Sequence, residues 1–303
     1  MSSDDSPNQQ YLADELQNFE EIAKFLRPSP GGIPRLEGVE IGGLSAPLRG
    51  GIGGDHIIYI DFNDRYDLDG RIEQAEKDGQ ERIAECLRGL RSRAGILVAD
   101  VSGHRITDAL VAAMLHQAFL LGAYYELDMF GEITTRIFEH INTRFHRTTS
   151  IHKFLTMIYG EISTDGKFRF ISAGHQPPAV FSREFGRFMP ISKDRLVSFP
   201  PVGMFPSRVD PDDRRYQNLF GYKEKYEVNE INLLANGDIL LLQTDGFAEH
   251  ADGRFFPELV EKLLAELADE PPARICDRLR EAMLELEPSR DDASVVVIKK
   301  ITA

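Results

Sequence analysis

The chain has 303 residues, a formal net charge of −14 and two cysteines, Cys86 and Cys276. Its length suffices for one large domain or two small ones. Nucleic acid and anionic lipid are bound mainly through basic patches, so this acidic balance predicts no nucleic-acid partner. No apolar run of about 18 residues and no signal-peptide pattern occurs, which predicts no membrane span. The low cysteine count argues against a disulfide framework or a cysteine zinc site and favours a cytoplasmic location.

The amino-terminal region is predicted to be a polar tail followed by an amphipathic helix. Residues 1–10 are polar and acidic, and residues 11–27 carry apolar side chains at helical spacing. The sequence PSPGG at 28–32 ends this helix. We expect residues 1–27 to precede the main body of the protein. The helix is expected to dock on that body or to pair with a second copy as a homodimer.

From about residue 38 onward the sequence changes to short strand patterns and longer helical ones. Strands are predicted at 56–62, 95–101, 154–162, 167–173, 179–182, 238–243 and 294–300. Helices are predicted at 71–92, 106–125, 129–147, 256–268 and 271–286. The polar segment 205–230 predicts an inserted loop. Because strands come in hairpins and helices in pairs, we expect an α+β fold in layers rather than a doubly wound parallel sheet.

Four aspartates recur at the ends of predicted strands beside glycine or a second aspartate. Asp55 follows two glycines and precedes a strand, and Asp100 lies near the end of another strand. Asp245 follows a strand and precedes Gly246, and Asp291 stands just before the last strand. Acidic residues are depleted in strands, so their recurrence at strand ends is unusual. Each aspartate taken alone also fits ordinary turn chemistry.

Carboxylates gathered at one end of a sheet would repel one another, and a divalent cation removes that repulsion. Oxygen ligands favour hard ions such as Mg²⁺ and Mn²⁺. Two such ions about 4 Å apart clamp a phosphate and activate a water. The residues by themselves therefore predict an acidic metal site, but spacing alone does not prove that the four aspartates converge.

Six motifs occur in order: GIGGD (51–55), VADVSGHR (98–105), SAGHQPP (172–178), PPVGMF (200–205), LLLQTDGFAE (240–249) and SRDDAS (289–294). Together they resemble the bacterial SpoIIE- and RsbU-like branch of the PPM (protein phosphatase 2C-like) family, over about residues 28–300. The resemblance implies an antiparallel β-sandwich flanked by helices, in α-β-β-α layers. It also implies one phosphatase domain over 28–303 that holds two Mn²⁺ or Mg²⁺ ions.

The resemblance also assigns roles by position. Asp55, Asp100, Asp245 and Asp291 match the carboxylates that hold the two ions. The backbone carbonyl of Val101 matches a further metal ligand. A metal-activated water would then hydrolyse the phosphoester directly, without a phosphoenzyme.

Several neighbouring residues are weaker candidates. Gly54 and Asp292 lie beside these ligands, and Asp292 falls where relatives carry Asn or Asp. His104 is a candidate general acid and equally a structural loop histidine. Arg105 stands where relatives commonly have glycine, and it either faces the phosphate or lies at the surface. His175 follows a strand, where turn packing is favoured over chemistry.

The chain also departs from the family pattern at His56, where relatives usually carry an aromatic residue, and in two long segments, 64–94 and 205–230. These differences are expected to affect substrate choice more than the metal site. The resemblance implies a metal-dependent protein serine/threonine phosphatase. Its expected partner is a phosphorylated protein, such as an anti-sigma-factor antagonist of a bacterial partner-switching pathway.

Two other functions remain open. The first is a catalytically silent phosphatase-fold binding module, supported only by His56 and Arg105. The second is a metal-dependent enzyme of another class, such as a phosphodiesterase. Phosphodiesterase metal sites usually mix histidine with aspartate, whereas these motifs hold aspartate almost alone.

Overall fold

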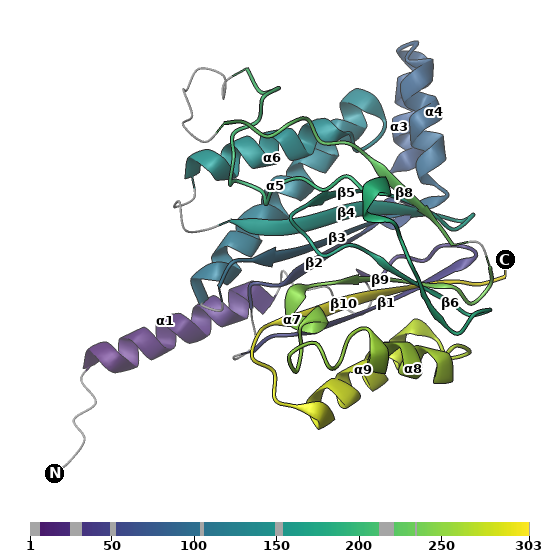
Figure 1. Ribbon diagram of the computed structural model, residues 1–303. Helices are drawn as coiled ribbons and strands as arrows, with labels where there is room; N and C mark the ends of the chain where they lie inside the picture. The colour runs from purple at the N-terminus through teal and green to yellow at the C-terminus, as the bar shows by residue number, and fades with distance from the viewer. Residues whose placement is uncertain are drawn as a thin grey trace.

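The computed structural model describes residues 7–24, 32–48, 53–103, 106–148, 154–211, 221–233 and 235–302. Within these residues two five-stranded antiparallel sheets stack face to face (Figure 1). One sheet has the order β1-β10-β9-β6-β7 and contains β1 (Val39–Ala46), β6 (Ala179–Ser182), β7 (Arg187–Met189), β9 (Ile239–Gln243) and β10 (Ala293–Lys300). The other has the order β2-β3-β4-β5-β8 and contains β2 (His56–Asp61), β3 (Arg93–Val101), β4 (Leu155–Ser163), β5 (Lys167–Ala173) and β8 (Asn229–Asn232).

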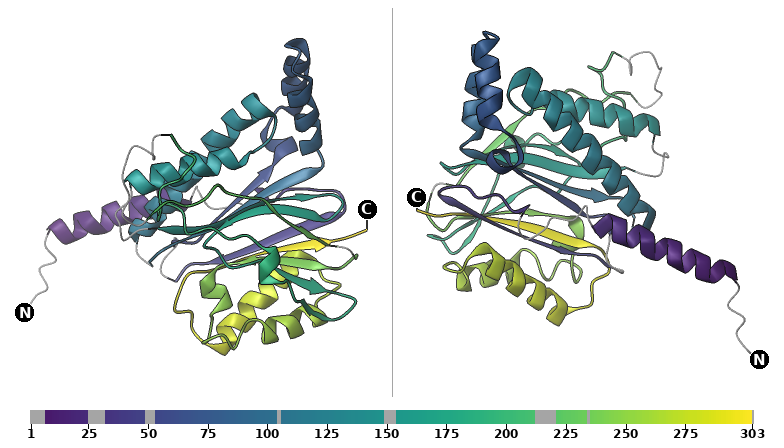
Figure 2. Two further views of the ribbon diagram at one scale, coloured as in Figure 1. Left: turned by 45° about the horizontal axis from the view of Figure 1, so that its top comes forward. Right: turned by 180° about the vertical axis from the view of Figure 1, so that it is seen from behind.

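Helices cover the outer faces of both sheets (Figures 1 and 2). The sheet that contains β2 is covered by α5 (Ile106–Phe130) and α6 (Thr135–Thr148). The sheet that contains β10 is covered by α8 (Glu258–Glu266) and α9 (Pro272–Leu286), with the short α7 (Asp245–Ala248) at one end. Three apolar layers result, one between the sheets and one under each helix layer. The predicted α-β-β-α sandwich is confirmed.

Strand β2 shows why the buried strands read as unbroken apolar runs. Its Ile57 and Tyr59 belong to the core between the sheets, whereas Ile58 and Ile60 belong to the core under the helices. Side chains of a strand alternate between the two faces of a sheet. Because both faces are covered, both sets of side chains are apolar.

The segment predicted as one helix at 71–92 is instead two helices that form a hairpin. The chain turns at Asp78–Gln80, where Gly79 adopts a φ of +68°, a left-handed conformation that favours glycine. The prediction of one continuous helix was therefore wrong, although its apolar face is correct, since Ile72 and Leu87 are buried. The elements of this region are α2 (Phe62–Arg65), α3 (Leu68–Lys77) and α4 (Glu81–Leu90).

The amino-terminal helix α1 (Pro7–Lys24) extends away from the body (Figure 1). It begins at Pro7, so the predicted polar tail of residues 1–10 is partly helical, and residues 25–27 of the predicted helix lie outside the described residues. Phe19 packs against Ala109 of α5. Much of the remaining apolar face is exposed to solvent, namely Tyr11, Leu12, Leu16 and Ile22.

One helix of the described part of the chain, Asp108–Phe130 within α5, is long and apolar enough to cross a membrane by length and composition. In this fold it packs against strand β3 and helix α6. Its Leu115, Phe119 and Leu127 are buried in the core under the helices. Only 33% of its apolar window is buried, and Leu121 and Met129 on its other face are exposed.

The segment 205–230, predicted as an inserted loop, is attached at its described ends to α6. Residues 212–220 lie outside the described residues. The Asn142 side chain donates to the carbonyl of Phe205 over 2.9 Å and accepts from the amide of Gly203 over 3.0 Å. The segment is therefore held by specific polar contacts, and its last residues enter strand β8.

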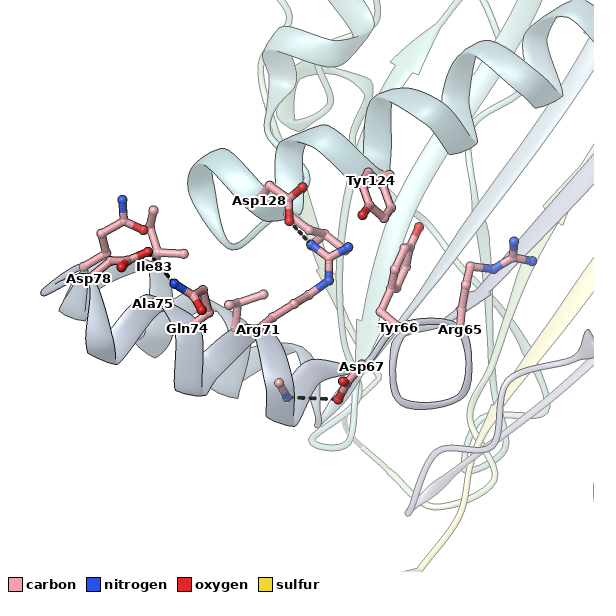
Figure 3. A pocket seen from close by; sticks show the side chains of 14 residues that line it. Arg65, Tyr66, Asp67, Arg71, Gln74, Ala75, Asp78, Ile83, Tyr124 and Asp128 are labelled. Atoms are coloured by element: carbon pink, nitrogen blue, oxygen red, sulfur yellow. Dashed lines mark hydrogen bonds and ion pairs between the residues drawn. The ribbon is translucent and has the colours of Figure 1, made fainter.

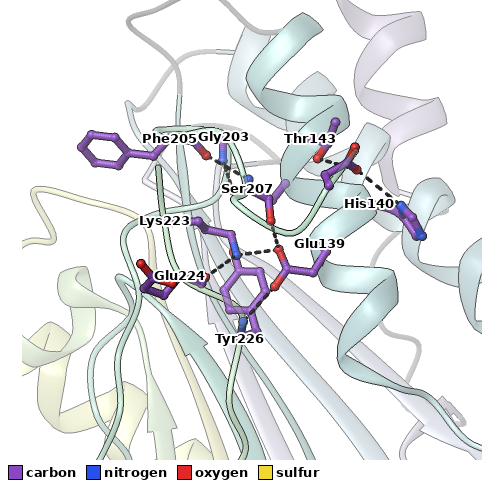
Figure 4. Close-up of polar contacts among 11 residues, drawn as sticks. Glu139, His140, Thr143, Gly203, Phe205, Ser207, Lys223, Glu224 and Tyr226 are labelled. Atoms are coloured by element: carbon purple, nitrogen blue, oxygen red, sulfur yellow. Dashed lines mark hydrogen bonds and ion pairs between the residues drawn. The ribbon is translucent and has the colours of Figure 1, made fainter. Parts of the chain in front are cut away.

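A buried ion pair completes this attachment (Figure 4). The ammonium of Lys223 lies 2.7 Å from the carboxylate of Glu139 on α6, and both side chains are almost fully buried. The amide of Tyr226 donates to the same carboxylate over 2.8 Å, and the Ser207 hydroxyl also bonds to it. The Glu139 carboxylate thus has several donors, as a buried charge requires.

Candidate metal centre

Strand register brings the predicted aspartates to the same end of the sandwich. His56 pairs with Ala99, so the start of β2 lies beside the end of β3, and Asp55 comes close to Asp100. Gln243 pairs with Val295, so the end of β9 lies beside the start of β10 in the facing sheet. Interactions of Asp100 with Asp245 and Asp291 link the two sheets. The four motifs therefore converge in the fold.

The glycines in these motifs allow the loops to approach one another. A Cβ on Gly246 would lie 1.9 Å from the backbone carbonyl oxygen of Asp292. A Cβ on Gly54 would lie 2.9 Å from the carbonyl oxygen of Val101, and one on Gly53 would lie 2.4 Å from the Asp292 carboxylate. Any side chain at these positions would push the aspartate-bearing segments apart. The glycines beside these aspartates are therefore needed for the loops to pack closely at this end of the sheets.

Asp292 braces this arrangement. Its two carboxylate oxygens accept hydrogen bonds from the amides of Leu48 and Gly54, each over 2.6 Å. Both oxygens are therefore engaged with the backbone before any ion binds. These contacts favour a role in holding the loop that carries Asp55 rather than a place among the metal ligands.

Asp55 is held from the facing sheet. The hydroxyl of Thr244 donates to its Oδ2 over 2.8 Å and accepts from the amide of Ser294 over 3.0 Å. Sequence reasoning did not single out Thr244. Its place directly before Asp245 in the TDG motif is the only signal that points to it.

Asp55 and Asp100 are difficult to ionise in this setting. Burial, followed by the charge of Asp100, raises the pKa of Asp55 well above its usual range. Burial, followed by the charges of Asp245 and Asp291, raises the pKa of Asp100 to about 8. A positive charge among them would reverse both effects, because an opposite charge favours the ionised form.

The donor set fits hard divalent cations. Carboxylate oxygens and the nearby Val101 carbonyl are the ligands that Mg²⁺ and Mn²⁺ prefer, whereas zinc sites usually include histidine or cysteine. In the part of the chain that the structure describes, no group of three or more His, Cys, Asp or Glu side chains is already arranged as a finished metal cage. The aspartates are nevertheless close enough that neighbouring carboxylates contribute to the raised pKa of Asp55 and that of Asp100.

The predicted histidine and arginine candidates differ in their placement. His104 and Arg105 lie outside the described residues. His175 is buried, and its Nδ1 lies 2.9 Å from the hydroxyl of Thr156 on β4. Burial lowers the pKa of His175 to about 4, which keeps the ring neutral. These contacts favour the structural interpretation of His175.

A pocket of about 230 Å³ opens beside Asp245 and Asp291, and Arg290 and Asp252 line it as an ion pair at 3.1 Å. A larger pocket of about 820 Å³ lies between the α3–α4 hairpin and the end of α5 (Figure 3). There the Arg71 guanidinium lies over the Tyr124 ring at 4.7 Å and pairs with an aspartate of α5. The smaller pocket is the better candidate for a reaction site because it adjoins the converging carboxylates.

Two facing antiparallel sheets between helix layers, with carboxylates gathered at one end, define a PP2C-type phosphatase domain. The profile of the family described as Stage II sporulation protein E (SpoIIE) matches residues 91–300. This match spans more than half of the chain, and the chain therefore belongs to the SpoIIE family.

Curated relatives support this assignment. The chain is 21% identical to phosphoserine phosphatase RsbU of Bacillus subtilis (strain 168) over 297 residues, which cover 95% of this chain and 72% of RsbU. Phosphoserine phosphatase RsbP of the same organism is 24% identical over 200 residues, which cover 66% of this chain and 42% of RsbP. The chain thus matches less than half of the length of RsbP.

Solved structures share the fold. The SiaA-PP2C domain of Pseudomonas aeruginosa has a TM-score of 0.63 at 16% identity, with 97% of this chain and 98% of that domain covered. The catalytic domain of the serine/threonine phosphatase PstP was solved with two manganese ions. It has a TM-score of 0.51 at 13% identity, with 87% of this chain and 99% of that domain covered. At these identities the likeness establishes the fold.

Proposed function

We propose that this chain is a metal-dependent protein phosphatase that hydrolyses phosphoserine or phosphothreonine. The observation that carries the proposal is the convergence of Asp55, Asp100, Asp245 and Asp291 at one end of the two sheets, where burial and neighbouring carboxylates raise the pKa of Asp55 and that of Asp100. The names of RsbU and RsbP as phosphoserine phosphatases, and the two manganese ions of PstP, support the same chemistry.

These four aspartates and the Val101 carbonyl would hold two Mn²⁺ or Mg²⁺ ions. Such ions supply an acidic water at neutral pH and neutralise charge on the phosphate oxygens. The chain's own contribution is to place the carboxylates. Thr244 orients Asp55 through a hydrogen bond of 2.8 Å, and Asp292 holds the loop that carries it.

His104 remains the candidate general acid and Arg105 the candidate phosphate contact. They lie four and five positions after Asp100 in the chain, which is the support for proposing them near the phosphate. A His104→Ala variant that loses activity on a phosphopeptide but keeps it on p-nitrophenyl phosphate would support the acid role. The reason is that p-nitrophenolate leaves without a proton.

For the substrate we propose a phosphorylated regulatory protein of a bacterial partner-switching pathway, such as an anti-sigma-factor antagonist, acting in the cytoplasm. The likeness to RsbU and RsbP supports this assignment. We place the phosphatase domain at residues 28–303, with 64–94 and 205–230 as insertions that influence substrate choice.

The decisive test measures Mn²⁺-dependent release of phosphate from a phosphoserine peptide. We expect activity in the wild-type protein and its loss in Asp55→Asn, with Asp194→Asn, a change at an exposed aspartate, as the matched control. If the wild type binds Mn²⁺ but is inert on phosphomonoesters, the catalytically silent binding module is the better interpretation. Cleavage of diesters alone would favour a phosphodiesterase.

We also propose that α1 forms a homodimer contact. Its exposed Leu12, Leu16 and Ile22 leave an apolar stripe facing solvent on a helix that extends from the body. Light scattering on a Leu12→Glu/Leu16→Glu variant should give half the mass of the wild type. Leu284→Glu, a change at an exposed leucine of α9, serves as the control. If the wild type and both variants all have the mass of a monomer, the dimer is ruled out.

A further inference from the structure

Two histidines join the first residue of β2 to the middle of α5. The Nε2 of His56 and the Nδ1 of His116 lie 2.8 Å apart, and the rings meet edge to face with centroids 5.1 Å apart. His56 is buried and His116 is half-buried. A hydrogen bond between two imidazoles needs one ring nitrogen that accepts, so at least one ring is neutral. Burial, followed by the charge of Arg65, lowers the pKa of His116 and favours its neutral form.

The direction of His56 follows from strand geometry. Ile58 and Ile60, two and four residues further along β2, face the core under the helices. His56 shares their face because strand side chains alternate. Asp55, one residue earlier, turns to the facing sheet, where the hydroxyl of Thr244 bonds to it. Asp55 and His56 thus connect one point of the backbone to both neighbouring layers.

This point of the backbone lies on an edge strand and directly after two glycines. Strand β2 is at the edge of its sheet, so in the described part of the chain only β3 pairs with it. Before Asp55 come Gly53 and Gly54, which have no side chains to anchor. The amide of Gly54 is held by Asp292. On the helix side, in the described part of the chain, His56 contacts His116.

We propose that His116 is a positioning residue, which fixes the start of β2 through His56 and thereby places Asp55 at the metal centre. The inference rests on the proposed function, because the position of Asp55 matters only if this carboxylate binds an ion. It also assigns a role to His56. Helix α5 thereby becomes part of the support of the metal centre.

The test measures Mn²⁺ affinity of the full chain by electron paramagnetic resonance of free Mn²⁺. His116→Leu fills the space without a hydrogen bond, and His116→Asn keeps a polar group near the position of Nδ1. Loss of a residue that orients a metal ligand typically weakens affinity about 10- to 100-fold. We therefore expect roughly 10-fold weaker binding in His116→Leu and recovery of most of that loss in His116→Asn. Gln117→Leu, at the exposed neighbour on α5, should bind as the wild type does.

Kinetics give a second measurement. The phosphatase rate of His116→Leu should fall at low Mn²⁺ and return toward the wild-type rate at saturating Mn²⁺, because the chemistry is intact once the ion is bound. If His116→Leu does not fold, His56→Phe replaces it, since this change keeps an aromatic ring and removes the same hydrogen bond. The double variant His56→Phe/His116→Leu should lose no more affinity than either single variant.

The outcomes separate the two proposals. Wild-type affinity in His116→Leu, or equal losses in His116→Leu and His116→Asn, would overturn the positioning role while the metal site stands. No Mn²⁺ binding by the wild-type protein would overturn the metal site and the positioning role together.

Discussion

Two buried groups of charged residues in this chain are built in opposite ways. At the α6 side, the Glu139 carboxylate meets the Lys223 ammonium at 2.7 Å, and the ring of Tyr226 lies 3.5 Å below the same ammonium. At the end of the sheets, the pKa of Asp55 and that of Asp100 are raised by burial and by other carboxylates. One group contains its own cation, whereas carboxylates dominate the other.

This is the difference that we expect between a structural ion pair and a group that binds an external cation. The Glu139–Lys223 pair is complete, so it can only hold the segment 205–230 on α6. The aspartates gain from a cation that the surroundings supply, because an added positive charge lowers the free energy of every ionised carboxylate nearby. Four substitutions and conditions test this contrast.

Breaking the complete pair should have the largest effect on stability. Lys223→Met leaves Glu139 buried without its cation, which typically costs about 3–5 kcal/mol. Urea unfolding should show this loss, and the Lys223→Met/Glu139→Gln double variant should recover part of it. Lys225→Met, a change at an exposed lysine, is the control. Equal midpoints for Lys223→Met and Lys225→Met would show that the pair does not support the fold.

Neutralising a carboxylate of the aspartate group should instead raise the stability of the metal-free protein. At neutral pH the raised pKa of Asp100 means that this carboxyl takes up a proton on folding, whereas asparagine is neutral in both states, so we expect the metal-free protein to gain about 1 kcal/mol of stability in Asp100→Asn. Mn²⁺-dependent phosphatase activity should fall by at least about 100-fold, since a ligand matters more than the residues that orient it. Thermal unfolding without metal and a phosphopeptide assay measure the two effects. A strong loss of metal-free stability would contradict the contrast between the groups.

The glycines of the aspartate end should tolerate no side chain. In Gly246→Ala the new Cβ would meet the Asp292 carbonyl, and overpacking of this kind costs about 1–3 kcal/mol. Gly89→Ala in helix α4 meets no atom closer than 3.9 Å and should stabilise the protein by up to about 1 kcal/mol. The midpoint of urea unfolding should therefore fall in Gly246→Ala and rise in Gly89→Ala, each relative to the wild type.

The smallest effect concerns pH. The pKa of Asp100 is about 8 in the folded metal-free protein, against an ordinary value of 3.8. Between these values the folded state binds more protons than the unfolded state, so this group lowers stability as the pH rises from about 4 to about 8. Mn²⁺ competes with that proton. The rise in Tm on adding Mn²⁺ should be a few degrees larger at pH 8 than at pH 6, and Asp100→Asn should reduce the difference.

Much of the fold was predictable where the local pattern is strong. The strands at 167–173 and 179–182 have the predicted bounds, and the first of them pairs with β4. The helix break at Gly79 was missed because the apolar positions of α3 and α4 continue one helical pattern. Strand β1 was missed because its sequence, VEIGGLSA, contains two glycines and depends on pairing with β10.

The aspartates were candidates from their motifs, whereas Thr244 and His116 were not. Thr244 and His116 act across layers of the sandwich, on residues 189 and 60 positions away, and no spacing in the sequence connects them. The structural role of Asp292 likewise depends on the amides of Leu48 and Gly54. The contacts of His104 and Arg105 remain predictions.

The sequence by itself determined the class of fold, the order of most elements and the acidic residues at strand ends. These follow from short-range properties, namely the period of apolar side chains and the turn preferences of glycine and aspartate. Only the tertiary structure decided that Asp55 lies beside Asp100 and that both meet Asp245 from the facing sheet. That convergence depends on strand register and sheet stacking, which are set by burial of the whole core rather than by any local segment.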